Sequence, residues 1–268
     1  MKNKGLITTV IVVVVIIIGL VVWYWYSSSP TEPTPIVNTN TNTNTTTNTS
    51  AAASANTAIA DYVDVDVDAA YELNLTESDL VILDVSPNFD LGHIADATNY
   101  YVGDGSLDAA IPTLDKDAPY LVYCHVDSAA ILGAQKLVDA GFPTVYRLVG
   151  NYSAWETAGY PISIALDAVG SVSGDVRVTV SYFDNTFFHE VFADIDEPAE
   201  GKFYEGWLVQ GTDFFSTGQL ENIGNPFYVL EYTATEDQRA YNQVVITEET
   251  ESLGLDGNPE THIFEGTF

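Results

Sequence analysis

The pattern of apolar and polar positions divides the chain into four segments of different kinds. Residues 6–26 form the longest apolar run, which contains no charged side chain and is rich in Val and Ile. As a helix, a run of this length spans about 31 Å, close to the thickness of a bilayer core. Lys2 and Lys4 precede the run, and the aromatic residues Trp23 to Tyr26 end it. We therefore predict a single transmembrane anchor at 6–26, a cytoplasmic tip at 1–5, and the rest of the chain outside the cytoplasm.

A cleaved signal peptide is the alternative interpretation of residues 6–26. The run is longer than the apolar region of such peptides, and no cleavage site of small residues follows it. Both observations favour an uncleaved anchor in the cell membrane. Residues 27–60 then form a stalk, because they are rich in Pro, Thr and Asn, show no apolar periodicity and are predicted to be disordered.

Strand-like and helix-like patterns alternate in residues 61–165. Short apolar runs are typical of buried strands, and between two of them apolar side chains follow one helical stripe that ends at Gly141. This alternation predicts an α/β domain built on a parallel sheet. The expected strands lie at 80–85, 121–123 and 145–148, and the expected helix at 128–140.

Residues 62–67 alternate, with Val63, Val65 and Val67 on one face and Asp64 and Asp66 on the other, which is typical of an edge strand with one solvated face. Asp68 is predicted to cap a short helix that runs through Leu75. Asp64, Asp66 and Asp68 also have the spacing of calcium ligands in an EF-hand loop. The glycine and the distal glutamate of such a loop are missing, so the sequence favours the edge strand.

Residues 170–268 contain short runs rich in Val, Tyr and Phe, separated by turn residues, and no amphipathic helix of useful length. This spacing predicts an antiparallel all-β sandwich. The fold class is therefore an α/β domain followed by an all-β domain, both behind a transmembrane helix. The expected strands of the second domain lie at 175–183, 187–194, 203–210, 227–233 and 242–248.

The charge composition excludes several classes of partner. The chain has 38 acidic residues against 8 Lys and Arg, a formal net charge of −30. Binding to phosphate-rich polymers requires clustered basic residues, so we expect no nucleic acid partner. The chain also has a single cysteine, so an internal disulfide is excluded and stability must come from core burial.

That cysteine, Cys124, is the candidate catalytic residue. It follows an apolar strand and precedes the helix at 128–140, so its thiol faces a helix N-terminus, which favours the thiolate. Asp127, three residues later, is expected to oppose this effect by raising the pKa of the thiol. A small buried apolar residue is the alternative interpretation, since lone cysteines most often have that role.

No metal and no cofactor are expected. Cys124, His125 and Asp127 include metal-ligating residue types, but no second cluster of Cys or His accompanies them. His189 and His262 are candidate ligands by residue type alone. Alternating strand patterns such as theirs place histidine more often at half-buried or surface positions.

A series of short motifs runs through residues 61–163: Leu83-Asp84-Val85, Gly92-His93-Ile94-Ala95-Asp96-Ala97-Thr98-Asn99, Leu121-Val122-Tyr123-Cys124, Leu137 to Phe142, Val145-Tyr146-Arg147-Leu148, Gly150 to Trp155 and Ala158-Gly159-Tyr160-Pro161. In these motifs and in their order, residues 61–163 resemble a rhodanese-like domain. The resemblance implies a central parallel sheet with flanking helices, and a persulfide formed on Cys124 and held by a substrate-binding loop. In this chain the loop is His125, Val126, Asp127, Ser128 and Ala129.

Two departures from the family pattern concern the chemistry. Active rhodaneses usually have arginine and glycine within the loop, and an arginine after the Asp-Val pair. Here the loop contains neither, and Ser86 follows Val85. Arginine binds oxyanions with two parallel hydrogen bonds. Without such an arginine, we expect thiosulfate to bind more weakly in this loop than a neutral or cationic sulfur donor.

Two other residues are expected to have structural roles. The turn at His93 is expected to stabilise the fold, and Trp155 is expected to pack beneath the last helix.

The second domain contains four short motifs: Tyr204-Glu205-Gly206-Trp207-Leu208-Val209, Gly218-Gln219-Leu220, Val244 to Glu248 and Asp256-Gly257-Asn258-Pro259. In their order these motifs resemble the extracytoplasmic β-sandwich of anti-sigma-K-type factors. The resemblance implies a binding or sensing domain, with a structural spacer as the alternative. Regulation of a sigma factor is not implied, because only about five residues precede the predicted anchor.

These inferences lead to two hypotheses for function. In the first, the chain is a membrane-anchored, extracytoplasmic sulfurtransferase of rhodanese type, which transfers sulfane sulfur from a small donor through a Cys124 persulfide. In the second, the rhodanese-like fold is catalytically inactive and serves as a surface binding or structural module with a protein partner. The position of the thiol favours the first hypothesis, and the missing arginines favour the second.

Overall fold

The computed structural model describes residues 61–268. The predicted anchor at 6–26 and stalk at 27–60 lie outside the described residues. Within 61–268, no helix is long and apolar enough to cross a membrane.

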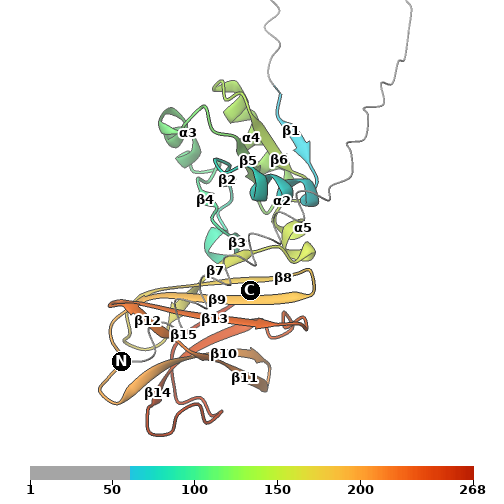
Figure 1. The fold of residues 1–268 in the computed structure, drawn as a ribbon. Helices are drawn as coiled ribbons and strands as arrows, with labels where there is room; N and C mark the ends of the chain where they lie inside the picture. The colour runs from blue at the N-terminus through green and yellow to red at the C-terminus, as the bar shows by residue number, and fades with distance from the viewer. Residues whose placement is uncertain (1–60) are drawn as a thin grey trace, which may run out of the picture. The chain divides into compact units, whose positions relative to one another are not determined.

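The α/β part of the structure, residues 61–161, is built on a parallel sheet, as predicted (Figure 1). The strand order is β1-β6-β5-β2-β4, and each neighbouring pair is parallel. The strands are β1 (Val63–Val65), β2 (Val81–Asp84), β4 (Thr98–Asn99), β5 (Tyr120–Tyr123) and β6 (Val145–Leu148). The other elements are α2 (Val67–Thr76), α3 (Ser106–Ala110), α4 (Asp127–Asp139), α5 (Asn151–Ala158), the 3-10 turns η1 (Phe89–Leu91) and η2 (Ile111–Thr113), and β3 (His93–Ile94).

The two faces of this sheet are covered by different helices, because side chains alternate along each strand. Leu121 and Tyr123 point to the face packed by α2 and α5. Val122 and Cys124 point to the opposite face, where α3 and α4 pack. The alternation of side chains along β5 and into Cys124 therefore places the sulfur of Cys124 on the α4 side of the sheet.

The three aspartates near the start of this part have separate structural roles. Asp66, not Asp68, is the N-cap of α2, and its side chain accepts a hydrogen bond from Ala69 N at 2.9 Å. The helix therefore begins two residues before the position that the sequence suggested. Asp68 accepts a hydrogen bond from the Tyr160 hydroxyl at 2.8 Å. Asp64 lies on edge strand β1 and pairs with Arg147. The calcium alternative gains no support, since residues 61–268 contain no cluster of three or more His, Cys, Asp or Glu side chains arranged for a metal.

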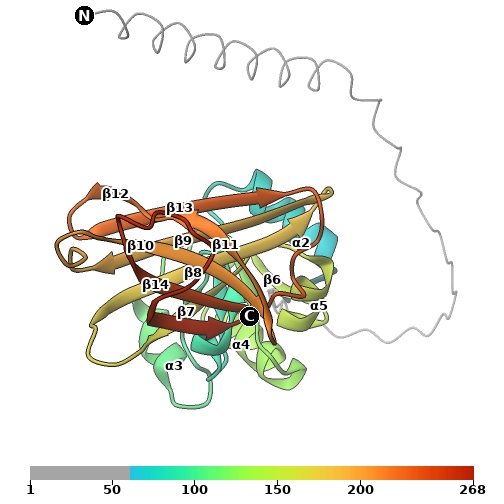
Figure 2. The ribbon, with the colours of Figure 1, turned by 90° about the horizontal axis from the view of Figure 1, so that it is seen from below.

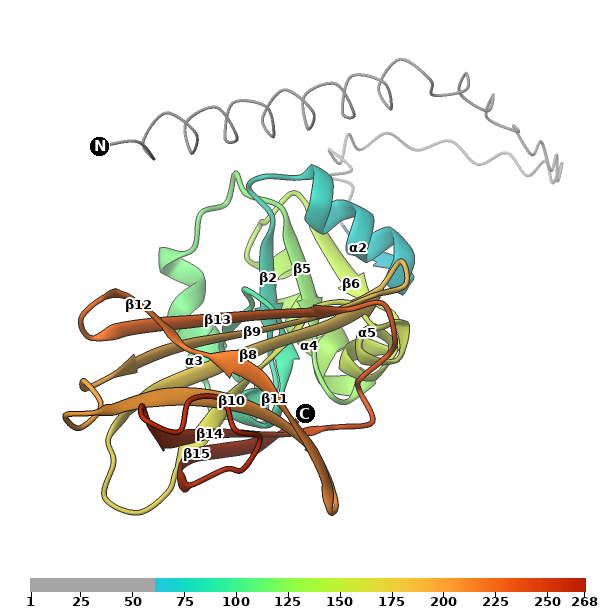
Figure 3. The ribbon, with the colours of Figure 1, turned by 60° about the horizontal axis from the view of Figure 1, so that its bottom comes forward.

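Residues 162–268 form a large antiparallel sheet that curls until it is nearly barrel-shaped (Figures 2 and 3). The prediction of an antiparallel all-β domain is confirmed, but the strands follow one continuous path rather than two separate sheets. The order is β11-β10-β14-β15-β7-β8-β9-β13-β12. The strands are β7 (Ile162–Ala168), β8 (Gly174–Phe183), β9 (Thr186–Ile195), β10 (Lys202–Gln210), β11 (Asp213–Gln219), β12 (Glu221–Gly224), β13 (Phe227–Ala234), β14 (Gln243–Thr250) and β15 (Thr261–Thr267).

Strand β7 spans the boundary that the sequence suggested between the two domains. Its first part pairs with β8 and its last residues pair with β15, so it joins the two halves of the curled sheet. It also pairs with β3 of the α/β part through Ser163 and Ile162. One continuous hydrophobic cluster contains Trp155 of α5 and Ile162 of β7. Residues 61–268 consequently belong to one compact unit.

His189 of β9 lies in the apolar interior of the curled sheet. The side chain is fully buried, and neither ring nitrogen has a hydrogen-bond partner. Burial lowers the pKa of His189 to about 4. In the unfolded chain His189 takes up a proton near pH 6.5, whereas in the folded chain it does so only near pH 4. The unfolded state is therefore favoured by protonation between these values, and the free energy of unfolding decreases as the pH falls from 6.5 to 4.

We expect acidification from pH 7 to pH 5 to cost the wild type about 2 kcal/mol more than it costs His189→Leu. Urea unfolding of both proteins at the two pH values measures the difference. Comparison with the variant cancels the contributions of other titrating groups. Equal losses in both proteins would show that His189 is not held neutral.

Candidate functional site

Cys124 lies where β5 ends, three residues before α4 begins. The backbone N–H groups of His125 and Val126 lie close to its sulfur and lower the pKa of the thiol. The side chain is fully buried, with 0% of its surface exposed, and it packs in the apolar cluster on the α4 side of the sheet. The loop therefore directs amides at the sulfur, but the sulfur lies beneath the surface.

The surroundings of Cys124 favour the neutral thiol at neutral pH. Burial is the largest effect and raises the pKa of Cys124, and the carboxylate of Asp84 raises it further. The amides of Val126 and His125 lower the pKa but do not outweigh burial. The acid that acts on the thiol is thus Asp84, and not Asp127 as the sequence suggested. Reaction as a thiolate requires the proton to leave the sulfur first.

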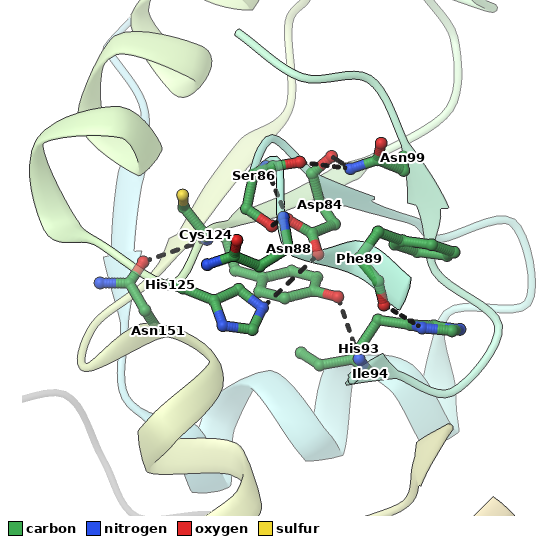
Figure 4. Close-up of polar contacts among 11 residues, drawn as sticks. Asp84, Ser86, Asn88, Phe89, His93, Ile94, Asn99, Cys124, His125 and Asn151 are labelled. Carbon is green, nitrogen blue, oxygen red and sulfur yellow. Dashed lines mark hydrogen bonds and ion pairs between the residues drawn. The ribbon is translucent and has the colours of Figure 1, made fainter. Parts of the chain in front are cut away.

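Asp84 and His125 form a pair of unsatisfied polar groups beside the cysteine (Figure 4). Asp84 ends β2 and is fully buried, and its Oδ1 accepts a hydrogen bond from Ser86 N at 2.8 Å. Its Oδ2 has no hydrogen-bond partner, and neither has His125 Nε2, which lies 4.0 Å away. Burial raises the pKa of the Asp84 carboxyl. The His125 ring is stacked on Tyr152, with ring centroids 4.6 Å apart.

Asn151 connects the two ends of the cysteine loop. Its Oδ1 accepts from Cys124 N at 3.3 Å, and its Nδ2 donates to Asp127 Oδ1 at 3.2 Å. The next residue, Tyr152, donates its backbone N–H to the carbonyl of Cys124 at 3.1 Å. Asn151 holds a φ of +58°, a left-handed conformation that asparagine tolerates better than most residues. The start of α5 therefore fixes the position of the loop.

Arg147 supplies the cation that the loop itself lacks. Its side chain extends from β6, is 8% exposed, and donates through Nη1 to Asp127 Oδ1 at 2.5 Å. Its other two nitrogens bind both carboxylate oxygens of Asp64 at 2.7 Å. Asp127 is thereby neutralised and held at the first turn of α4.

The other residues of the predicted substrate-binding loop lie at or near the protein surface. Val126, Asp127 and Ser128 are exposed and Ala129 is half-buried. His93 lies outside the loop, stacks on Phe89 and makes a 3.0 Å hydrogen bond to its carbonyl, in agreement with the structural role expected. Within the described part of the chain no metal cluster forms around Cys124, His189 or His262.

Three residues of the site were not among the candidates: Asp84, Arg147 and Asn151. The sequence did contain a signal for Asp84 and Arg147, because both lie at or near the carboxyl ends of predicted parallel strands. Such ends gather at one edge of a sheet, which is where functional side chains of α/β proteins collect. Asn151 offered no comparable signal, since its contacts depend on the tertiary position of α5.

Replacing Asp84 with asparagine tests the electrostatics of the thiol. Asparagine keeps the acceptor for Ser86 N and removes the charge, so we expect the pKa of Cys124 to fall. At pH 8, alkylation of Cys124 by iodoacetamide should become roughly threefold faster. Asp79→Asn, at the opposite end of β2, is the matched control and should leave the rate unchanged. A slower rate in Asp84→Asn would contradict this description of the site.

Comparisons with known proteins find relatives for part of the chain. Residues 66–158 match the family described as Rhodanese-like domain. A thiosulfate sulfurtransferase GlpE from Coxiella burnetii is 36% identical over 98 residues, which cover 36% of this chain and 88% of that protein. The protein of the same description from Pseudomonas fluorescens is 33% identical over 93 residues, covering 34% and 83%. Among solved structures, the Alr3790 protein from Anabaena sp. is 28% identical, covers 37% of this chain and 89% of the solved chain, and has a TM-score of 0.34.

Proposed function

Because the chain belongs to the rhodanese-like family through residues 66–158, we propose that it transfers sulfane sulfur through a persulfide on Cys124. The observation that supports this most strongly is the pair of backbone N–H groups, from His125 and Val126, directed at the one sulfur of the described chain. Such donors stabilise an anionic sulfur. The similarity to proteins described as thiosulfate sulfurtransferases supports the same reaction class.

The reaction consists of two displacements. The thiolate of Cys124 attacks the sulfane sulfur of a donor, and the bond between that sulfur and the donor breaks with its electron pair on the departing group. The product is a persulfide on Cys124. An acceptor thiolate then attacks the outer sulfur and releases Cys124 as a thiolate. Asn151, Arg147 and Asp127 keep the loop amides in place during both steps, and none of them touches the transferred sulfur.

We also propose that this reaction takes place outside the cytoplasm, on a protein anchored by residues 6–26. The support is the length and apolarity of that run, the lysines before it and the aromatic residues that end it. For residues 170–268 we propose a binding or sensing role with a surface protein partner, supported by the resemblance to anti-sigma-K-type extracytoplasmic domains. A structural spacer is the alternative for this part.

Turnover of a sulfur donor with a thiol acceptor tests the proposed function. The wild type should release sulfide from dithiothreitol and a sulfane sulfur donor, and Cys124→Ser should release none above the uncatalysed rate. Circular dichroism of both proteins controls for folding. Equal rates for the wild type and Cys124→Ser would instead favour the alternative, in which the rhodanese-like fold is a catalytically inactive binding or structural module.

A further inference from the structure

A cleft of about 940 Å³ lies between the α/β part and the curled sheet, beside the pairing of β3 with β7 (Figure 1). Its floor is the outer face of β7, β8 and β9, and its wall is the segment 89–99. No residue of the loop 124–129 lines it, so the cleft is separate from the site at Cys124. Its volume and its place between two packed parts are typical of small-molecule sites.

Arg177 of β8 lies on the floor of this cleft and has an unoccupied guanidinium. It makes no ion pair and no hydrogen bond with another residue of 61–268, although the chain contains 38 acidic residues. In a chain so rich in carboxylates, an unpaired arginine is free to bind the carboxylate of a ligand with two parallel hydrogen bonds. All other lysine and arginine side chains of residues 61–268 are bonded to a carbonyl or a carboxylate: Lys116, Lys136, Arg147, Lys202 and Arg239.

A row of four polar side chains crosses the cleft next to Arg177. In register these are His93, Ser163, Thr179 and Glu190, on β3, β7, β8 and β9. Ser163 is 7% exposed, and its hydroxyl makes no hydrogen bond within residues 61–268. A polar group at so buried a position normally has a partner, so an occupant of the cleft is expected to supply one.

His93 contributes a hydrogen-bond acceptor rather than a charge. Its Nδ1 lies 3.0 Å from the carbonyl oxygen of Phe89, so Nδ1 carries a proton and the neutral ring keeps Nε2 as an acceptor. Burial lowers the pKa of His93, the Phe89 carbonyl and the Asp84 carboxylate oppose this effect, and the charge of Arg177 lowers the pKa further. The ring is therefore neutral at pH 7, and Arg177 is the cation among the residues that line the cleft.

Four carboxylates surround this single cation. Glu190 is a diagonal neighbour of Arg177, because the direct cross-strand partner of Arg177 is Phe192. A ligand with only negative charge is repelled by the carboxylates, and one with only positive charge is repelled by the guanidinium. A molecule that bears both an ammonium and a carboxylate complements both. The carboxylates belong to Asp90, Asp96, Asp175 and Glu190.

An exposed aromatic ring borders Arg177. Phe192, directly opposite Arg177 on β9, is 42% exposed and lines the cleft. Phe89 lines the facing wall. An aromatic or large apolar group of a ligand would remove this surface from water.

We propose that the cleft binds a free α-amino acid with an aromatic or large apolar side chain. Arg177 binds the carboxylate, Glu190 and His93 Nε2 accept hydrogen bonds from the ammonium, and the side chain lies against Phe192. Diagonal neighbours on one face of a sheet lie within about 8 Å of each other, which suits a ligand whose two charged groups share one carbon atom. This binding does not depend on sulfur transfer at Cys124.

Four small molecules that each differ by one group provide the test. L-phenylalanine has all three groups, 3-phenylpropionate lacks the ammonium, phenethylamine lacks the carboxylate, and glycine lacks the side chain. Isothermal titration calorimetry of the full-length protein at pH 7 measures the affinity for each. We expect L-phenylalanine to bind at least about tenfold more tightly than each of the other three.

Arg177→Gln and Arg239→Gln form a matched pair of variants with equal net charge. Arg177 is exposed, so Arg177→Gln should fold normally, bind L-phenylalanine about tenfold more weakly and bind phenethylamine no more weakly than the wild type. Arg239 is bonded to Asp237 and does not line the cleft, so Arg239→Gln should leave the affinity for L-phenylalanine unchanged. Comparison of the two variants cancels the general attraction of an acidic chain for amines.

Three results would overturn the proposal. The first is unchanged affinity for L-phenylalanine in Arg177→Gln, and the second is equal affinity of the wild type for L-phenylalanine and for either analogue that lacks one charge. The third is the absence of L-phenylalanine binding at concentrations up to about 10 mM. Each of these results leaves the proposed reaction at Cys124 untouched, because that reaction is measured by sulfide release.

Discussion

Arg147→Met is expected to slow persulfide formation on Cys124 tenfold or more and to lower the free energy of unfolding by about 3 kcal/mol. The substitution removes a buried guanidinium whose three donor groups are all bonded to carboxylates. Asp64 and Asp127 are about half exposed and can be rehydrated, so the cost lies at the lower end for a broken buried ion pair. Without Arg147, Asp127 keeps only the bond from Asn151, and the loop that directs amides at the sulfur loosens.

Two further variants separate stability from loop position. Asp64→Asn weakens the bidentate pair but leaves the bond between Arg147 and Asp127, so it should lower stability and leave the persulfide rate nearly unchanged. Arg147→Lys keeps the charge without the planar fork and should recover part of the rate. Urea unfolding measures stability, and the pH profile of Cys124 alkylation reports on the loop. An Arg147→Met protein with a wild-type alkylation profile would show that the arginine has no role in positioning the loop.

Trp155→Ala is expected to lower the free energy of unfolding by about 4 kcal/mol. Trp155 is fully buried, and its ring makes edge contacts with Tyr71 and Tyr160. Its Nε1 donates to the carbonyl of Pro161 at 2.9 Å, just before β7 begins. The alanine variant therefore loses apolar contacts, leaves a cavity and removes the donor to a half-buried carbonyl.

Trp155→Phe fills most of the cavity but does not restore the hydrogen bond, so its cost should be about half as large. Denaturant unfolding followed by circular dichroism compares the three proteins. Because Trp155 and Ile162 share one hydrophobic cluster, the sheet of residues 162–268 should unfold in the same transition. A loss below about 1 kcal/mol, or a separate transition for the sheet, would contradict the shared core.

The strands and helices of the α/β part could be predicted from the sequence, because each is marked by a local apolar run or stripe. The apolar runs at 80–85 and 145–148 overlap β2 and β6, and the stripe in 128–140 lies within α4 except at its last residue. The N-cap of α2 was misplaced because Asp66 and Asp68 are both acceptable capping residues. Only the bond from Ala69 N to Asp66 distinguishes them.

The curled sheet was harder to predict. The expected segments overlap β8, β9, β10, β13 and β14, each of which has several buried positions. Strand β12 has no buried residue, so no apolar pattern marks it. Closure into one sheet also depends on β7, which pairs with both halves, and no local pattern encodes such a partner choice.

The site illustrates which features a sequence can supply. The position of Cys124 after a strand follows from the apolar run before it. The neutralisation of Asp127 by Arg147 joins residues 20 positions apart, and the effect of Asp84 on the thiol joins two strands. These contacts follow from the order of the strands in the parallel sheet rather than from spacing along the chain.

The most direct test of this account is intact-mass spectrometry of the wild type and Cys124→Ser after brief exposure to cysteamine persulfide. The account predicts that the wild type gains the mass of one sulfur atom, that dithiothreitol removes it, and that Cys124→Ser gains nothing. A wild type that stays unmodified while fully folded would contradict sulfur transfer at Cys124.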